Sequence, residues 1–305
     1  MIRRPPRSTQ GVSSAASDVY KRQRSVSELF DLALTIVHSH WRSLLILLLI
    51  GSAPWILIDY FLLLPLMHFG SGDPSRWACS WLMMLLVVSQ AQYGTSLITL
   101  YLGEAMFVGQ PDWKQVAISS LRVSPLFVWL HGILRLVFPV AGLTWLLNID
   151  DPSDFGVMVA LFIPAAVAMG LAFRAFRPFV TEMILLEKTP WRTKKPNQIN
   201  FAKRSKALHS HASSELFGRF VLSCLFAAPL AISFQSLFVQ VDSLLNLSAG
   251  YEWTLASYYW IVSLWLTAGF VATFRFLSYI DIRIRQEGWA LELKMKAEGQ
   301  KLALG

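Results

Sequence analysis

Long apolar blocks alternate with short polar connectors along most of this chain. A helix needs about 20 consecutive, mostly apolar residues to cross a bilayer, and several of the blocks reach or exceed that length. The pattern therefore predicts an all-α fold, a polytopic membrane bundle of about six transmembrane helices. The predicted spans cover about residues 41–69, 77–102, 125–147, 155–186, 216–238 and 253–277.

Shorter segments flank these spans. Ser25 and Glu28 form a capping-box pattern before an apolar face, which predicts a helix on the membrane surface or against the bundle. Residues 113–123 are short, amphipathic and basic, so we expect a second interfacial helix there. The fourth span continues through Pro178, where we expect a kink. A charged helix over 281–302 is expected to end the chain.

The chain divides into three parts by composition. Residues 1–23 are polar, basic and rich in serine and proline, so they cannot bury enough apolar surface to fold. They resemble translated sequencing-adapter read-through; the other interpretation is a genuine disordered tail. Residues 24–281 form the predicted six-helix transmembrane domain, and residues 282–305 a charged tail expected in the cytoplasm.

Composition and charge agree with a membrane protein. Hydrophobic residues make up 54% of the chain and charged residues only 15%, against about 25% charged residues in ordinary soluble domains. The net charge of +8 is compatible with nucleic-acid binding, but the lysines and arginines lie mainly between the apolar blocks. That placement follows the positive-inside rule. We therefore expect membrane lipids and no nucleic acid as partners, and the sequence identifies no protein partner.

The connectors alternate between few and many cationic residues. The connector after the fourth span has seven lysines and arginines, the loops after the third and fifth have none, and the first loop has only Arg76. Cationic connectors stay on the cytoplasmic side. The alternation predicts a multi-pass protein of the cytoplasmic (inner) membrane with both termini in the cytoplasm.

Motifs for catalysis or cofactor binding are absent from the sequence. It has no phosphate-binding glycine loop, no Gly-x-Ser-x-Gly elbow and no His-Glu-x-x-His zinc motif. Cys79 and Cys224 lie in apolar blocks without a Cys-x-x-Cys pattern, which indicates buried apolar residues. We therefore predict no catalytic residue, no cofactor, no metal and no enzyme activity.

Ionisable residues within or beside the spans are the remaining candidates. A charge at the bilayer centre costs at least about 2.5–3.5 kcal/mol, so such residues often mark function. Asp59 and Arg135 are candidates for an intramembrane ion pair; the other interpretation is that each snorkels to the headgroups. Four cations are candidates for lipid headgroup contacts, although those of the connector also serve to set orientation. These are Arg174, Arg177, Lys194 and Lys195.

Four local patterns occur in order along the chain. They are Ser-x-x-Glu-Leu-Phe-Asp at residues 25–31, Gly109-x-Pro111 before a helix ending Arg122-x-x-Pro125-Leu126, Glu187 followed by Arg204-Ser205-x-x-Leu208, and Tyr-Ile-Asp-Ile-Arg-Ile-Arg-Gln-Glu-Gly at residues 279–288. Together they resemble the bacterial six-helix membrane domain fused to some glycerophosphodiester phosphodiesterases, and its stand-alone relatives. The resemblance covers about residues 24–295.

The resemblance implies a fold and a set of motif positions. The stand-alone members have no established activity, and spans and short connectors occupy this chain, so an enzymatic role is not carried over. Between Glu187 and Arg204 the chain is more basic than the family pattern. A cytoplasmic ion-pair cluster linking spans four, five and six would explain the charged motif positions. The motif positions are Glu187, Arg204, Ser205, Asp281 and Arg283.

Three function classes follow. The first, favoured by absent motifs and short loops, is a non-catalytic scaffold or lipid-interacting helper. The second is a small transporter or permease-like protein with a polar path through the bundle, to which Pro54, Pro139 and Pro164 are permissive hints, because broken helices often form sites at the bilayer midplane. A membrane-embedded enzyme would need carboxylates or histidines clustered at one depth, and no such cluster is evident.

Overall fold

The computed structural model is all-helical in the residues that it describes, with no strand among them. Several predictions lie outside these residues: the tail 1–23, most of the interfacial helix 113–123 and of the third span, and the chain beyond 287. The described residues are 25–68, 73–108, 162–187, 200–210, 213–245 and 252–287, together with 116, 118, 127 and 129.

The N-terminal helix α2 (Val26–Ser39) packs against the bundle. The Ser25 hydroxyl accepts a hydrogen bond from the Glu28 N–H at 3.2 Å, and the Glu28 carboxylate accepts one from the Ser25 N–H at 3.1 Å. This reciprocal capping box satisfies two N–H groups that the start of a helix leaves without partners. The apolar face of α2 contacts α13, where the ring centroids of Phe30 and Phe274 lie 4.2 Å apart.

The second predicted span is interrupted at Thr95. The hydroxyl of Thr95 donates to the carbonyl of Ala91 at 2.6 Å, and Ser96 donates in the same way to Tyr93. Such bonds from Ser and Thr to preceding carbonyls bend helices. The result is two helices where one continuous helix was expected. The helices of this part of the chain are α3 (Trp41–His68), α4 (Asp73–Gly94) and α5 (Ser96–Val108).

The fourth predicted span is divided at Pro178. Helix α9 (Ile163–Phe176) ends two residues before this proline, and α10 (Val180–Leu185) begins two residues after it. Proline has no N–H group to donate, and its ring crowds the preceding turn. The expected kink is therefore a break between two helices. All six residues of α10 are buried, and α10 packs against α5.

The last described helix runs further than the sequence pattern predicts. Residues 281–287 of the charged helix expected over 281–302 are helical, and they continue α13 without a break at Asp281. No proline or glycine interrupts this stretch, and Asp281 is neutralised by an ion pair with Arg219. The helices in this part of the chain are α11 (Phe201–Ser210), α12 (Ser213–Leu245) and α13 (Glu252–Glu287).

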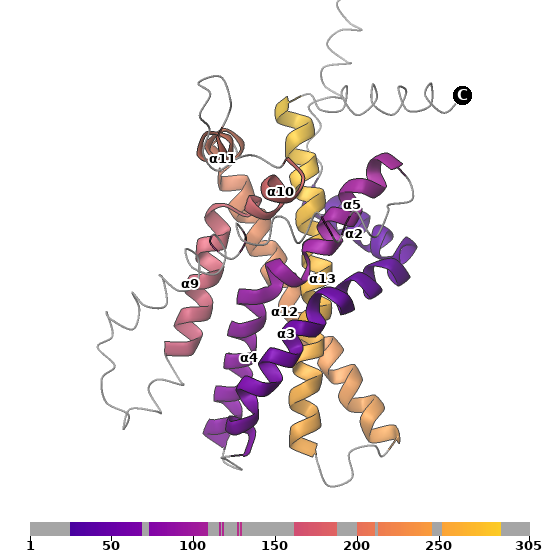
Figure 1. Ribbon diagram of the computed structural model, residues 1–305, viewed down its shortest axis with the longest axis vertical. Helices are drawn as coiled ribbons and strands as arrows, with labels where there is room; N and C mark the ends of the chain where they lie inside the picture. Colours follow the sequence, from indigo (N-terminus) through magenta and orange to yellow (C-terminus); the bar gives the residue numbers. More distant parts are fainter. Residues whose placement is uncertain are drawn as a thin grey trace, which may run out of the picture.

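Helix α13 is the central element of the bundle. It runs through the length of the helical assembly and contacts α2, α3, α4, α5 and α12 (Figure 1). Of its most apolar stretch 67% is buried, against 11% for α12. Helix α12 therefore carries exposed apolar side chains, among them Leu225, Leu237 and Leu244. A large exposed apolar surface of this kind is typical of a membrane contact.

Four helical stretches within the described ranges are long and apolar enough to cross a membrane. The third predicted span lies outside those ranges, and α9 has only 14 residues. By the length and composition of its helices, the protein is a helical, multi-pass membrane protein. The four stretches are Trp41–Phe61, Ser80–Met106, Ser213–Leu245 and Tyr258–Arg285.

Two glycines set the spacing of α3, α4 and α13. A Cβ atom added to Gly51 would lie 2.1 Å from the carbonyl oxygen of Gly94. A Cβ added to Gly94 would lie 2.3 Å from the ring of Trp265, which is buried on α13. Small residues let helix backbones approach this closely in membranes.

Candidate functional site

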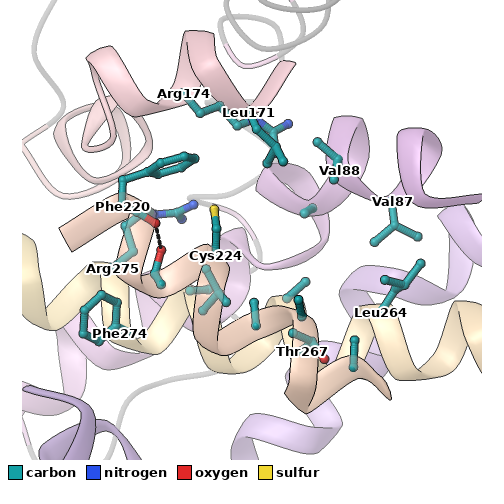
Figure 2. Close-up of a pocket in the computed structure, with 18 of the residues that line it drawn as sticks. Val87, Val88, Leu171, Arg174, Phe220, Cys224, Leu264, Thr267, Phe274 and Arg275 are labelled. Atoms are coloured by element: carbon teal, nitrogen blue, oxygen red, sulfur yellow. Dashed lines mark hydrogen bonds between the residues drawn. The ribbon is translucent and has the colours of Figure 1, made fainter. Parts of the chain in front are cut away.

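A cavity of about 450 Å³ lies between α4, α9, α12 and α13 (Figure 2). Its volume is within the roughly 300–1,000 Å³ typical of small-molecule sites. Most of its wall is apolar and includes Val87, Leu171, Phe220 and Leu264. Shape and lining therefore suit a ligand that is apolar over most of its length.

Helix breaks and small side chains create the cavity. Thr95, at the break between α4 and α5, and Pro178, at the break between α9 and α10, both line it. On α12 and α13 the wall contains Ala231, Ala268 and Ala272, which leave space that larger side chains would fill. The same breaks also let the chain place α10 close to α13.

The charged residues of the cavity gather at one end. Figure 2 shows Arg174 and Arg275 on the side of Phe220, away from Val87 and Leu264. Arg174 reaches the carbonyl oxygen of Ser89 on α4 at 3.4 Å.

Arg275 is held at this end by α4 and α10. Its Nε donates to Oε1 of Glu182, and its Nη1 donates to the side-chain oxygen of Gln92. The hydroxyl of Thr181 donates to the same oxygen of Gln92 at 2.6 Å. Glu182 is fully buried, and a buried carboxylate requires an opposite charge close by. Arg275 supplies that charge.

Arg219 joins α12 to α13. Its Nη2 lies 2.7 Å from Glu215 Oε1 and 2.7 Å from Asp281 Oδ2. Arg285, one turn beyond Asp281, approaches the same carboxylates at 2.6 and 3.2 Å. Shared carboxylates fix both guanidinium groups, and Arg219, only 3% exposed, lines the cavity.

Glu187 is the centre of a second group of contacts near the end of α10. Arg204 of α11 donates to both of its carboxylate oxygens, at 2.6 and 2.8 Å. The Tyr279 hydroxyl donates to Glu187 at 2.6 Å, and Arg283 lies 3.6 Å away. Bidentate arginine–carboxylate contacts are among the stronger hydrogen bonds in proteins. This group joins α10, α11 and α13.

The five motif positions predicted from the sequence thus have different contacts in the structure. Glu187 meets Arg204 and Arg283, and Asp281 meets Arg219. Ser205 is fully buried in α11, where its carbonyl accepts a hydrogen bond from Nδ1 of His209 at 2.7 Å. Ser205 therefore belongs to the packing of α11.

The other predicted residues are spread apart. Asp59 is buried and accepts a hydrogen bond from the Gln90 side chain at 2.6 Å, and it does not line the cavity. Its expected partner Arg135 lies outside the described residues, as do the headgroup candidates Lys194 and Lys195. Arg174 lines the cavity and Arg177 is exposed.

Several residues at the centre of the site are absent from the sequence predictions. Glu182, Arg219 and Arg275 are not among the site residues predicted there. One signal was available: Glu182 stands alone in an apolar run, and Glu215 and Arg219 have the i,i+4 spacing of a helical ion pair.

Four buried donor groups at the polar end have no acceptor within the described part of the chain. They are Nε and Nη1 of Arg219, Nη2 of Arg275 and the hydroxyl of Ser278. An unsatisfied buried donor costs about 1–3 kcal/mol, and more when it is charged. The cavity thus ends in hydrogen-bonding capacity that the surrounding described helices do not use.

Within the described ranges, no group of three or more His, Cys, Asp or Glu side chains could hold a metal ion. Comparisons of the chain with protein-family models, with curated proteins and with solved structures gave no match. The interpretation of the site therefore depends on its geometry.

Proposed function

We propose that the protein is a non-catalytic, lipid-interacting protein of the cytoplasmic membrane, and that it holds a lipid in the cavity between α4, α9, α12 and α13. The distribution of chemistry along the cavity carries this proposal. Lining residues on α13 extend from 260 to 278, roughly 27 Å at 1.5 Å per residue. The wall is apolar over most of that length and cationic at one end, which matches a lipid with a long apolar chain and an anionic headgroup.

The position of the cavity also favours a lipid over a water-soluble ligand. Ala228 and Ile232 of α12 line it and are exposed. They belong to the apolar helix that is least buried in the bundle. A ligand passing these residues comes from hydrocarbon, because an apolar surface of this kind faces lipid.

An obstructing substitution tests the proposal. Ala228→Phe places a large ring at the cavity wall, whereas Ala53→Phe places the same ring at an exposed position of α3 that does not line the cavity. Native mass spectrometry of the wild-type protein, purified in mild detergent, is expected to show about one tightly bound lipid per chain. We expect Ala228→Phe to lower that occupancy several-fold and Ala53→Phe to leave it unchanged.

Two results would contradict the lipid-binding proposal. One is a wild-type protein that carries no lipid after gentle purification. The other is equal lipid occupancy in the two phenylalanine variants, since the bound lipid would then lie elsewhere on the apolar surface.

The proposal includes six spans with both termini in the cytoplasm. The charge alternation of the connectors supports it, and so does the resemblance to the bacterial six-helix domain. We expect green fluorescent protein fused after residue 302 to fluoresce and alkaline phosphatase fused there to be inactive. Fusions after residue 246, in the loop that follows the fifth span, are expected to give the reverse. An active phosphatase after residue 302 would overturn the orientation.

A second candidate is a small transporter. The supporting observation is that the helix breaks at Thr95 and Pro178 both line the cavity, as discontinuous helices do in many carriers. Asp59, the candidate for an intramembrane ion pair, is not part of that wall. Flux of a lipid or organic anion into proteoliposomes, abolished by Ala228→Phe, would favour transport over simple lipid binding.

A further inference from the structure

Two arginines at the polar end of the cavity, Arg219 and Arg275, each use one part of the guanidinium group and leave another without a partner among the described residues. Arg219 directs Nη2 to Glu215 and Asp281, and its Nε and Nη1 have no acceptor. Arg275 directs Nε and Nη1 to Glu182 and Gln92, and its Nη2 has none. Protein carboxylates therefore hold both groups in place without exhausting their donors.

The hydroxyl of Ser278 adds a neutral donor at the same end. Ser278 follows Arg275 by three residues on α13, so the two side chains lie on one face of the helix. Asp281, three residues further, binds Arg219 at 2.7 Å and so brings that arginine to this face. Ser278 is 2% exposed, lines the cavity and has no hydrogen-bond partner in the described structure.

We infer that this end of the cavity binds the anionic oxygens of a lipid headgroup, a phosphate or a carboxylate, through Arg219, Arg275 and Ser278. The inference rests on the lipid-binding function proposed above and specifies the class of lipid. Guanidinium groups bind planar or tetrahedral oxyanions with several parallel hydrogen bonds. The oxygens of such an anion accept hydrogen bonds from donors of this kind, and the apolar wall takes the acyl chain.

Headgroup selectivity is the direct test. The purified protein is equilibrated with equal amounts of phosphatidylglycerol and of diacylglycerol, which lacks the phosphate, both with the same acyl composition, and the bound lipid is identified by native mass spectrometry. We expect the anionic lipid to be bound at least roughly tenfold more often, the lower end of the range that one hydrogen bond to a charged group supplies. Equal occupancy of the two lipids would overturn the inference.

Inorganic phosphate separates a lipid headgroup from a free anion. We expect an excess of phosphate to leave the bound anionic lipid in place, because phosphate forms no contact with the apolar wall. Displacement of the lipid by phosphate alone would overturn the assignment to a lipid headgroup.

Ser278→Ala and Ser263→Ala form a matched pair on α13. Ser263 is also buried, but its hydroxyl donates to the Tyr259 carbonyl at 2.6 Å and it does not line the cavity. Ser278→Ala removes a hydroxyl without a partner, so folding is expected to be unaffected. We expect this variant to lose most of the preference for phosphatidylglycerol, and Ser263→Ala to keep it. Unchanged preference in Ser278→Ala would contradict the inference.

Arg219→Lys provides a stronger version of the same test. Lysine keeps the positive charge beside Glu215 and Asp281 but removes the unused donors Nε and Nη1. We expect headgroup preference to fall while the total amount of bound lipid changes less. If this variant does not fold, Ser278→Ala decides the question.

The two proposals fail in different ways. If Ala228→Phe reduces total bound lipid, but the wild-type protein shows no headgroup preference and Ser278→Ala changes nothing, the headgroup assignment is wrong and the proposal of a lipid-binding cavity stands. If the wild-type protein retains no lipid of any class, both are wrong.

Discussion

Replacing Arg275 by methionine is expected to lower the free energy of unfolding by about 3–5 kcal/mol, the cost of leaving one member of a buried ion pair without its partner. Glu182 is fully buried and forms an ion pair with Arg275. Methionine fills much of the volume of the arginine but supplies no positive charge. Denaturant unfolding in a mixed detergent, followed by tryptophan fluorescence, measures the change.

Arg285→Met is the matched control. Arg285 is also in an ion pair, but its partner Glu215 has a side chain that is 32% exposed and keeps Arg219 as a second partner. We expect a loss of about 1 kcal/mol or less, as for exposed ion pairs. The double variant Arg275→Met with Glu182→Leu is expected to recover most of the lost stability, because replacing both members of a buried pair by apolar residues is often neutral. Equal losses in the two single variants would contradict this account of Glu182.

Gly51→Ala is expected to destabilise the protein by about 1–3 kcal/mol, the range for adding a methyl group to a close-packed contact. The new Cβ would lie 2.1 Å from the carbonyl oxygen of Gly94. This oxygen is a backbone atom, so α3 and α4 must move apart as whole helices. Because Gly94 in turn lies against Trp265, the displacement would reach the central helix. The midpoint of thermal unfolding in a fixed detergent measures the effect.

Gly218→Ala controls for the intrinsic preference of alanine over glycine in helices. A Cβ at Gly218 of α12 meets no atom within 4 Å. We expect this variant to be unchanged or more stable by up to about 1 kcal/mol. If Gly51→Ala were as stable as Gly218→Ala, the close approach of α3 and α4 would not be part of the fold in the membrane.

The ion pairs and the cavity are connected by the same residues. Arg275 and Arg219 each bind a carboxylate that holds the helices together, and both residues line the cavity. Charged side chains that are already held in place lose little conformational entropy when a ligand binds, because their orientation is set before the ligand arrives. We therefore expect the polar end of the cavity to be organised before a lipid enters.

Much of the fold follows from local pattern. The capping box of Ser25 and Glu28, the apolar run that forms α3 and the division of the fourth span at Pro178 are each set by residues within a few positions of one another. The interruption at Thr95 was not predicted from the sequence, because a threonine hydroxyl can donate to a carbonyl of the preceding helical turn or to another acceptor. In the structure it donates to the Ala91 carbonyl, and Gly94 beside it packs against Trp265.

The cavity could not be predicted in the same way. Arg219 and Arg275 are 56 positions apart from one another in the chain, and the sequence does not say which carboxylate each would meet. Glu182 meets Arg275 only because the break at Pro178 turns α10 toward α13. The position of Glu182 in an apolar run indicated a buried charge, but only the packed structure shows that Arg275 is its partner.

The sequence by itself determined the helical, membrane-spanning character of the protein, because hydrophobic length and charge placement act on each segment independently of the others. The tertiary structure alone decided which buried charges neutralise one another, how closely α3 and α4 approach, and where a cavity with cationic residues at one end lies. These features depend on distances between segments remote in sequence, and such distances are set by the packing of helices rather than by local preference.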